Sequence, residues 1–298
     1  MNSIELEGVN KFFGHHHAVA DMSFSVPAGS VYGFLGPNGA GKTSTIRMIM
    51  SILYPDSGRV TVLGSNNPES VKDRLGYLPE EKGLYKKMKT RELIAYFGTL
   101  KGLPWREAHT RAQALLERFG LQASADQKCE SLSKGMGQKV QIISTLIHEP
   151  EVVILDEPFS GLDPINVEMV RDVILDLRRQ GRTVIFSTHI MEQAEQICDA
   201  LLLVNGGRKI LDGPVADIKR DFEPTLLVDF EGDARHLDQP GVTRINNMGR
   251  KAELSIAQDA DPQMIMQSLM REMSITGFSV REPSLHEIFV RAVRESAT

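Results

Sequence analysis

Residues 36–43 read GPNGAGKT, and this stretch decides the fold. It matches the pattern G-x-x-x-x-G-K-[ST], and it lies between an apolar run typical of a buried strand (30–35) and a helical pattern that continues to about Leu53. Glycines in such a loop let backbone N–H groups converge on phosphate oxygens. Lys42 is then expected to reach the β- and γ-phosphates as a point charge, and the Thr43 hydroxyl to ligate Mg²⁺.

A second motif, VVILDEP at residues 152–158, supplies two carboxylates that suit this loop. Its apolar run predicts a buried central strand, so that Asp156 emerges at the carboxyl end of the sheet, beside the phosphate loop. We expect Asp156 to hold Mg²⁺ through water and Glu157 to polarise the attacking water. The two motifs together predict an enzyme that binds and hydrolyses a nucleoside triphosphate.

Strand-like and helical segments alternate through the first two-thirds of the chain, which predicts an α/β fold with a mainly parallel sheet between helices. Residues from about 85 to 148 are helical, with a break at 102–104, and read as an inserted subdomain. The predicted first domain covers residues 1–222. Residues 223–298 predict a small α+β domain, in which a methionine-rich helix either packs on the sheet or offers a soft surface to a partner.

Composition excludes several classes of protein. The formal net charge of −5 argues against a protein whose main task is to wrap nucleic acid, so no nucleic-acid partner is expected. The longest apolar runs are far shorter than the ~20 residues that span a bilayer, so a membrane role would require a partner. Two distant cysteines predict reduced thiols, and the histidines at 15–17 lack metal-ligand spacing and predict a solvated turn rather than a metal site.

The stretch SLSKGMGQKVQ at residues 131–141 predicts a helix that starts unusually. Ser133 is a suitable cap, and apolar residues then recur on one helical face. Gly135 and Gly137 in the first turn each cost the helix roughly 1 kcal/mol relative to alanine. A helix start with bare glycines exposes N–H groups and the positive end of the dipole, which suits an anion.

With these motifs in view, residues 3–220 resemble the ATP-binding subunit of an ABC transporter. That family carries an LSGGQ signature, or the variant LSGGM-x-Q-[RK], which LSKGMGQK matches apart from Lys134 and Gly137. SGLDP at 160–164 resembles the family's D-loop, with Asp163 as its acidic residue, and His189 in STH matches the switch histidine at the γ-phosphate. Phe13 stands where the family places an aromatic that stacks on adenine; the alternative is a core phenylalanine.

The resemblance implies ATP and Mg²⁺ as the bound nucleotide and metal. The nucleotide-binding set would be Phe13, Gly36, Pro37, Asn38, Gly39, Ala40, Gly41, Lys42, Thr43 and Ser44. Four signature residues would cover the nucleotide of a second copy in a homodimer: Ser133, Lys134, Gly135 and Met136. Glu157 would act as base and His189 would contact the γ-phosphate. A separate integral membrane subunit would bind the ATPase to the inner face of the cell membrane.

Two positions depart from the family pattern. GYLPEEKGLY at 76–85 carries Glu80, followed by Glu81, where the family usually has a glutamine that ligates the metal and couples to the membrane subunit. A glutamate is also able to ligate Mg²⁺, so Mg²⁺ dependence is expected. Lys134 replaces a glycine, and it either assists closure of the dimer or points to solvent.

This loop, and the C-terminal PSLHEIFV at 283–290, resemble ABC-2 type exporter ATPases, including sodium and antibiotic exporters. Export is therefore the expected direction. The alternative is a soluble ABC-type ATPase that acts on ribosomes or DNA. A plain P-loop kinase or GTPase would not account for the signature, SGLDP and His189 together.

Overall fold

The computed structural model describes residues 1–80 and 83–296, and Glu81 lies outside this part of the chain. The chain divides into two compact units, Met1–Gly213 and Pro214–Thr298. The expected boundary after residue 222 falls inside the second unit, because Arg220, the last residue of α7 (Val215–Arg220), and Phe222 just after it both contact that unit. The Gln258 side chain donates to the Arg220 carbonyl over 2.7 Å, and the Arg291 guanidinium lies 5.6 Å from the centre of the Phe222 ring.

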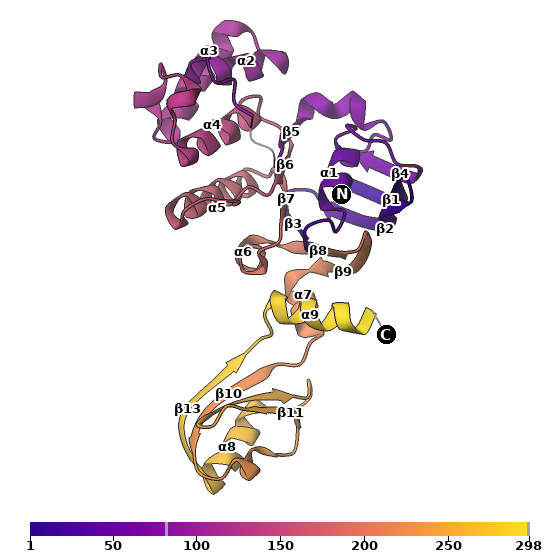
Figure 1. The fold of residues 1–298 in the computed structure, drawn as a ribbon, viewed down its shortest axis with the longest axis vertical. Coiled ribbons are helices and arrows are strands. Elements are labelled where there is room, and N and C mark those ends of the chain that lie inside the picture. The colour runs from indigo at the N-terminus through magenta and orange to yellow at the C-terminus, as the bar shows by residue number, and fades with distance from the viewer. Residues whose placement is uncertain (81–82, 297–298) are drawn as a thin grey trace. The chain divides into compact units, whose positions relative to one another are not determined.

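A six-stranded sheet forms the centre of the first unit (Figure 1), in the order β5-β6-β7-β3-β8-β9. The pairs β5–β6, β6–β7, β7–β3 and β3–β8 are parallel, as the alternation of strands and helices predicts. Every residue of the three middle strands β6, β7 and β3 is buried, which explains why their sequences are mostly apolar. The strands are β3 (Val31–Leu35), β5 (Leu75–Leu78), β6 (Val152–Asp156), β7 (Thr183–Thr188), β8 (Ala200–Asn205) and β9 (Arg208–Pro214).

One face of this sheet is covered by α1 (Lys42–Ile49) and by a separate antiparallel sheet, β2-β1-β4. These strands are β1 (Asn2–Phe13), β2 (His16–Pro27) and β4 (Ser57–Val62). The sequence predicts the strand β4 but not its antiparallel pairing. It gives no expectation for the strands β1 and β2. Ile46 and Ile49 of α1 share one buried core with Phe34 of β3 and Leu6 of β1.

The opposite face carries α5 (Pro164–Arg179) and α6 (Met191–Ile197), while the helical insert lies beyond the β5 edge (Figure 1). The insert contains α2 (Thr90–Leu100), α3 (Trp105–Arg118) and α4 (Lys134–Leu146), with the predicted break between α2 and α3. Short 3₁₀ turns are η1 (Pro68–Arg74), η2 (Gln122–Ser124) and η3 (Cys129–Ser131). No helix in residues 1–80 and 83–296 combines the length and the apolar character needed to cross a bilayer.

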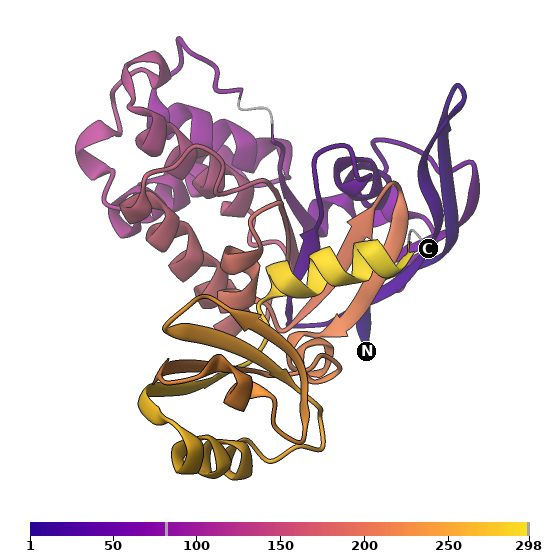
Figure 2. The ribbon, with the colours of Figure 1, turned by 60° about the horizontal axis from the view of Figure 1, so that its bottom comes forward.

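The second unit is an antiparallel four-stranded sheet, in the order β11-β12-β10-β13, with α8 along one face (Figure 2). Its helix α8 buries Ile265 and Leu269 against the sheet, whereas Met264 and Met270 are exposed. Packing therefore does not account for those two methionines. The elements are β10 (Thr225–Glu231), η4 (Ala234–Leu237), β11 (Val242–Asn247), β12 (Lys251–Ile256), α8 (Pro262–Glu272), β13 (Ser274–Arg281) and α9 (Leu285–Ser296).

Candidate nucleotide-binding site

The loop between β3 and α1 is held in a conformation that requires glycine. Gly36 has φ of 150° and Gly41 has φ of 100°, both in the region that side chains disfavour. A Cβ on Gly36 would lie 2.2 Å from the Val204 carbonyl oxygen, and one on Gly41 would lie 2.5 Å from the Ala18 carbonyl oxygen. The neighbouring backbone therefore approaches too closely for any other residue, and the loop wraps around an open centre.

The start of α1 leaves its backbone donors available. Gly41 is the N-cap, and among the described residues no side chain caps the helix and no acidic residue lies in its first turn. Lys42 is 6% exposed, and its ammonium donates to the carbonyls of Gly36 over 2.7 Å and Pro37 over 3.1 Å. A buried cation beside bare helix N–H groups is a site for a polyanion.

Asp156 ends β6 beside this loop, as the sequence predicts. Its Oδ1 accepts from the Thr43 hydroxyl over 3.4 Å and from the Ser187 hydroxyl of β7. The carboxylate is 1% exposed, yet its Oδ2 has no hydrogen-bond partner among the described residues. A buried carboxylate oxygen left without a donor, next to a threonine hydroxyl, fits a Mg²⁺ ion and its water shell.

Glu157 is held beside a histidine and a lysine. Its Oε2 lies 3.1 Å from His189 Nδ1, and its Oε1 lies 3.7 Å from Lys42 Nζ. The backbone of Glu157 has φ of 49°, a strained conformation for a residue with a side chain, and its N–H donates to the Ser187 hydroxyl over 2.9 Å. Strain of this kind persists only where the surroundings enforce it, and here it turns the carboxylate toward Lys42.

Ser187 is the functional residue that the sequence reasoning missed. Its hydroxyl donates to Asp156 and accepts from the Glu157 N–H, so it fixes both carboxylate residues at once. It is fully buried near the end of β7, after the apolar run at residues 184–186. A buried serine two residues before His189 is the signal that points to it, because parallel strands end at the same edge of a sheet.

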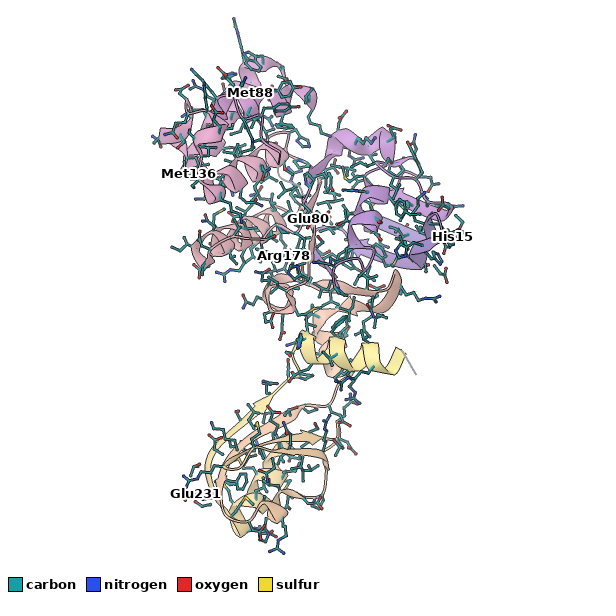
Figure 3. All side chains as sticks on the ribbon, viewed as in Figure 1. His15, Glu80, Met88, Met136, Arg178 and Glu231 are labelled. Atoms are coloured by element: carbon teal, nitrogen blue, oxygen red, sulfur yellow. The ribbon has the colours of Figure 1, made fainter. Side chains whose placement is uncertain are left out.

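The phosphate loop and Glu157 line a cleft of about 450 Å³, whereas Asp156 and His189 are not among the residues that line it. Phe13 lies at its edge and is 50% exposed, so it is not a core phenylalanine. Glu80, labelled in Figure 3, is exposed and lines the same cleft. Of the three histidines expected in a turn, His15 lies in the turn, whereas His16 and His17 begin β2. The cleft residues are Phe13, His16, Ala18, Asn38, Gly39, Ala40, Gly41, Lys42, Thr43, Ser44, Glu80 and Glu157.

The glycine-rich stretch 133–136 is not among the described residues that line this cleft. Ser133 caps α4, accepting a hydrogen bond from the Met136 N–H over 3.3 Å, as predicted (Met136 is labelled in Figure 3). Gly135 lies against the Asn166 side chain, which donates to Asp163 over 2.6 Å. The Asn166 backbone and side-chain N–H groups hold the pKa of the Asp163 carboxyl below its usual value. The stretch therefore lies outside the described lining of its own chain's cleft.

Comparison with known proteins assigns the family. Residues 19–160 match the family described as "ABC transporter", and residues 213–293 match "ATP-binding protein DrrA1-3-like, C-terminal domain". The "Uncharacterized ABC transporter ATP-binding protein YhaQ" of Bacillus subtilis (strain 168) is 38% identical over 97% of this chain and 98% of that protein. This chain is an ABC transporter ATP-binding protein. It is therefore an ATPase subunit of a transporter, which decides against the ribosome- or DNA-directed alternative.

Two further comparisons agree with membership of the ABC family. The "Nod factor export ATP-binding protein I" of Rhizobium leguminosarum bv. viciae is 33% identical over 97% of this chain and 94% of its own length. The solved structure of cbiO1 from Clostridium perfringens, described as part of the ABC transporter complex cbiONQ, is 25% identical. It superposes with a TM-score of 0.65 over 74% of this chain and 94% of that one.

Proposed function

We propose that the cleft binds Mg·ATP and that the residues at its edge hydrolyse the β–γ phosphoanhydride bond. The observation that carries this proposal is that the loop 36–44, which includes Lys42, lies beside Asp156, Glu157 and His189. Thr43 and Asp156 would hold Mg²⁺, with Glu80 as a further candidate ligand. The metal, when bound, neutralises charge on the β- and γ-phosphate oxygens.

In this proposal Glu157 is the general base. One of its oxygens has no hydrogen-bond partner among the described residues, so it is free to accept a proton from the attacking water. The Lys42 ammonium lies 3.7 Å from this oxygen, and a bound γ-phosphate would draw the ammonium to itself. His189 is half-exposed, with its ring at the Glu157 carboxylate, and is positioned to contact the γ-phosphate.

A second copy of the chain would complete each site. Ser133 and the N–H groups that follow it are exposed or half-exposed and do not line the cleft of their own chain. The start of α4, where the Ser133 hydroxyl accepts from the Met136 N–H within its own chain, would cover the γ-phosphate bound by the partner, while the D-loop with Asp163 would cross the interface. ATP would then close a homodimer, and hydrolysis would reopen it.

We further propose that this dimer drives export through a separate membrane subunit at the inner face of the cell membrane. Support comes from relatives: one is named for Nod factor export, and another is part of a multi-component transporter complex. The DrrA1-3-like C-terminal domain matches the expected ABC-2 type of exporter ATPase.

The Glu157→Gln variant tests this proposal. It keeps the shape of the side chain and removes the base, so hydrolysis should fall about 10²- to 10⁴-fold while ATP still binds. Light scattering with excess ATP and Mg²⁺, with the membrane subunit present, should then show a trapped dimer of the ATPase. Glu117→Gln, on exposed α3, is the matched control. If Glu157→Gln hydrolyses ATP at the normal rate, Glu157 is not the base. If the variant stays monomeric, the proposed ATP-bound homodimer is contradicted.

A further inference from the structure

Lys134 lies on the D-loop of its own chain. The structure places its ammonium directly over Gly161: a Cβ built on that glycine would lie 2.2 Å from Lys134 Nζ and 3.1 Å from Cε. Gly161 has φ of 66°, in the left-handed region. The lysine at the start of α4 therefore packs on the one D-loop residue that has no side chain, although much of the lysine is exposed to solvent.

Two more contacts join the same helix to the same loop. Gly135 packs so closely on Asn166 that an added Cβ would lie 2.5 Å from the amide nitrogen, and Asn166 in turn bonds to Asp163. Gln138 is 1% exposed and donates to the Pro158 carbonyl over 3.1 Å. The first turns of α4 thus hold the 158–166 segment at its beginning, middle and end.

The segment that Lys134 contacts begins at the proposed catalytic base. The Ser160 N–H donates to the Glu157 carbonyl over 3.1 Å, and the Leu162 N–H donates to the Phe159 carbonyl over 3.3 Å. These two turns connect Gly161 to the strained backbone of Glu157. A shift of Gly161 is therefore transmitted over few bonds to Glu157, whose strained backbone conformation depends on its surroundings.

We propose that Lys134 is a positioning residue that fixes the D-loop, and through it Glu157, in its own chain. The inference rests on the proposed role of Glu157 as base. Its physical basis is packing: a long side chain over a glycine limits the excursions that a left-handed glycine otherwise permits. Lys134 is thereby given a role within one chain, distinct from dimer closure and from a solvated charge.

Hydrogen exchange of the isolated full-length chain tests the contact without relying on catalysis. In Lys134→Ala, amides of residues 158–163 should exchange roughly fivefold faster, while those of the phosphate loop at 36–43 stay unchanged. Alanine is used because it preserves the helix start. Lys134→Arg, which keeps a long cationic side chain over Gly161, should restore slow exchange. Lys87→Ala, at an exposed lysine in the same insert, is the matched control.

Kinetics then test the consequence. Lys134→Ala should lower kcat on the order of tenfold with KM for ATP unchanged, because the cradle is intact and only the base is less well placed. Unchanged exchange at 158–163, or altered exchange with normal kcat, overturns the proposal. Failure of the base assignment would be distinguishable. In that case Glu157→Gln would hydrolyse ATP at the normal rate, while Lys134→Ala would still show faster exchange at residues 158–163.

Discussion

His189 Nδ1 lies 3.1 Å from Glu157 Oε2, while the other oxygen of that carboxylate lies 3.7 Å from the Lys42 ammonium. Glu157 is buried, and His189 is half-exposed. The carboxylate thus lies between a cation from the phosphate loop and an imidazole that follows the neighbouring strand. In the proposed mechanism, both neighbours would change partner when a γ-phosphate binds.

We predict that His189→Ala lowers the rate of ATP hydrolysis by about 10² or more while nucleotide affinity changes little. The reason is that the loop 36–44 and Lys42 remain in place, whereas Glu157 loses the group that orients it. Steady-state hydrolysis and titration with a fluorescent ATP analogue measure the two effects. His109→Ala, at a partly buried histidine of α3 that packs on Trp105 and does not line the cleft, provides the comparison. Equal rates for both variants would show that His189 has no part in the chemistry.

We predict that Glu80→Gln weakens the apparent affinity for Mg²⁺ and leaves hydrolysis dependent on the metal. Glu80 is exposed at the cleft, and a neutral amide oxygen binds a hard cation less strongly than a carboxylate does. The measurement is ATP hydrolysis as a function of Mg²⁺ concentration. Unchanged activity and unchanged metal affinity would show that Glu80 is not a ligand.

Gly41→Ala should destabilise the first unit far more than Gly39→Ala does. Both glycines have positive φ, 100° and 79°, so both variants incur backbone strain. Only at Gly41 would the new methyl group meet backbone, 2.5 Å from the Ala18 oxygen; at Gly39 nothing lies within 4 Å. We expect losses in the free energy of unfolding of about 3 kcal/mol and about 1 kcal/mol respectively, measured by urea denaturation. Equal losses would contradict the packing argument.

Stability at acid pH should depend on His148. Burial lowers the pKa of its imidazole below the ordinary value of 6.5, against the opposing effect of the hydrogen bond at the Leu75 carbonyl, 3.0 Å away. The unfolded chain therefore binds more protons in the window from about pH 6.5 down to the folded pKa. The stabilisation is complete above this window and is lost as the pH falls through it.

The measurement for His148 is the melting temperature between pH 7.5 and 5.5. His148→Gln retains an N–H for the Leu75 carbonyl but cannot titrate, so its melting temperature should fall less over this range than that of the natural chain. Parallel pH profiles for the two proteins would contradict the assignment to His148.

Much of the first unit's α/β core follows from the sequence, because both its chemistry and its hydrophobic periodicity are local. The buried strands around Val153 and Ile185, the loop at 36–43 and the cap at Ser133 lie where they are predicted. Strands β1 and β2 were not predicted. In β1 the two-residue alternation breaks between Leu6 and Val9, where the pairing shifts register. In β2 the alternation is present, with Met22, Phe24 and Val26 buried, so this local signal was available and was missed.

The contacts among distant side chains could not be predicted in the same way. That Ser187 bonds to Asp156 follows once the strand order is known, but strand order is a property of the folded sheet. The position of Lys134 over Gly161 depends on how α4 meets the loop before α5, which no local pattern encodes. In the sequence, Lys134 is recognisable only as a departure from the family's signature, where a glycine is usual. The packing in the folded chain shows that it contacts Gly161.

The glycine turn between β8 and β9 also sets a limit on protein engineering. The Gly207 N–H donates to the Ala40 carbonyl and its own carbonyl accepts from the Ala20 N–H, so this hairpin tip is bonded to the phosphate loop and to β2. An epitope or fluorescent reporter inserted there would separate the loop from its support and abolish nucleotide affinity. The tip at Met248–Gly249 is the permissive position, because Met248 is exposed and a Cβ added to Gly249 would meet no atom within 4 Å in the described part of the chain.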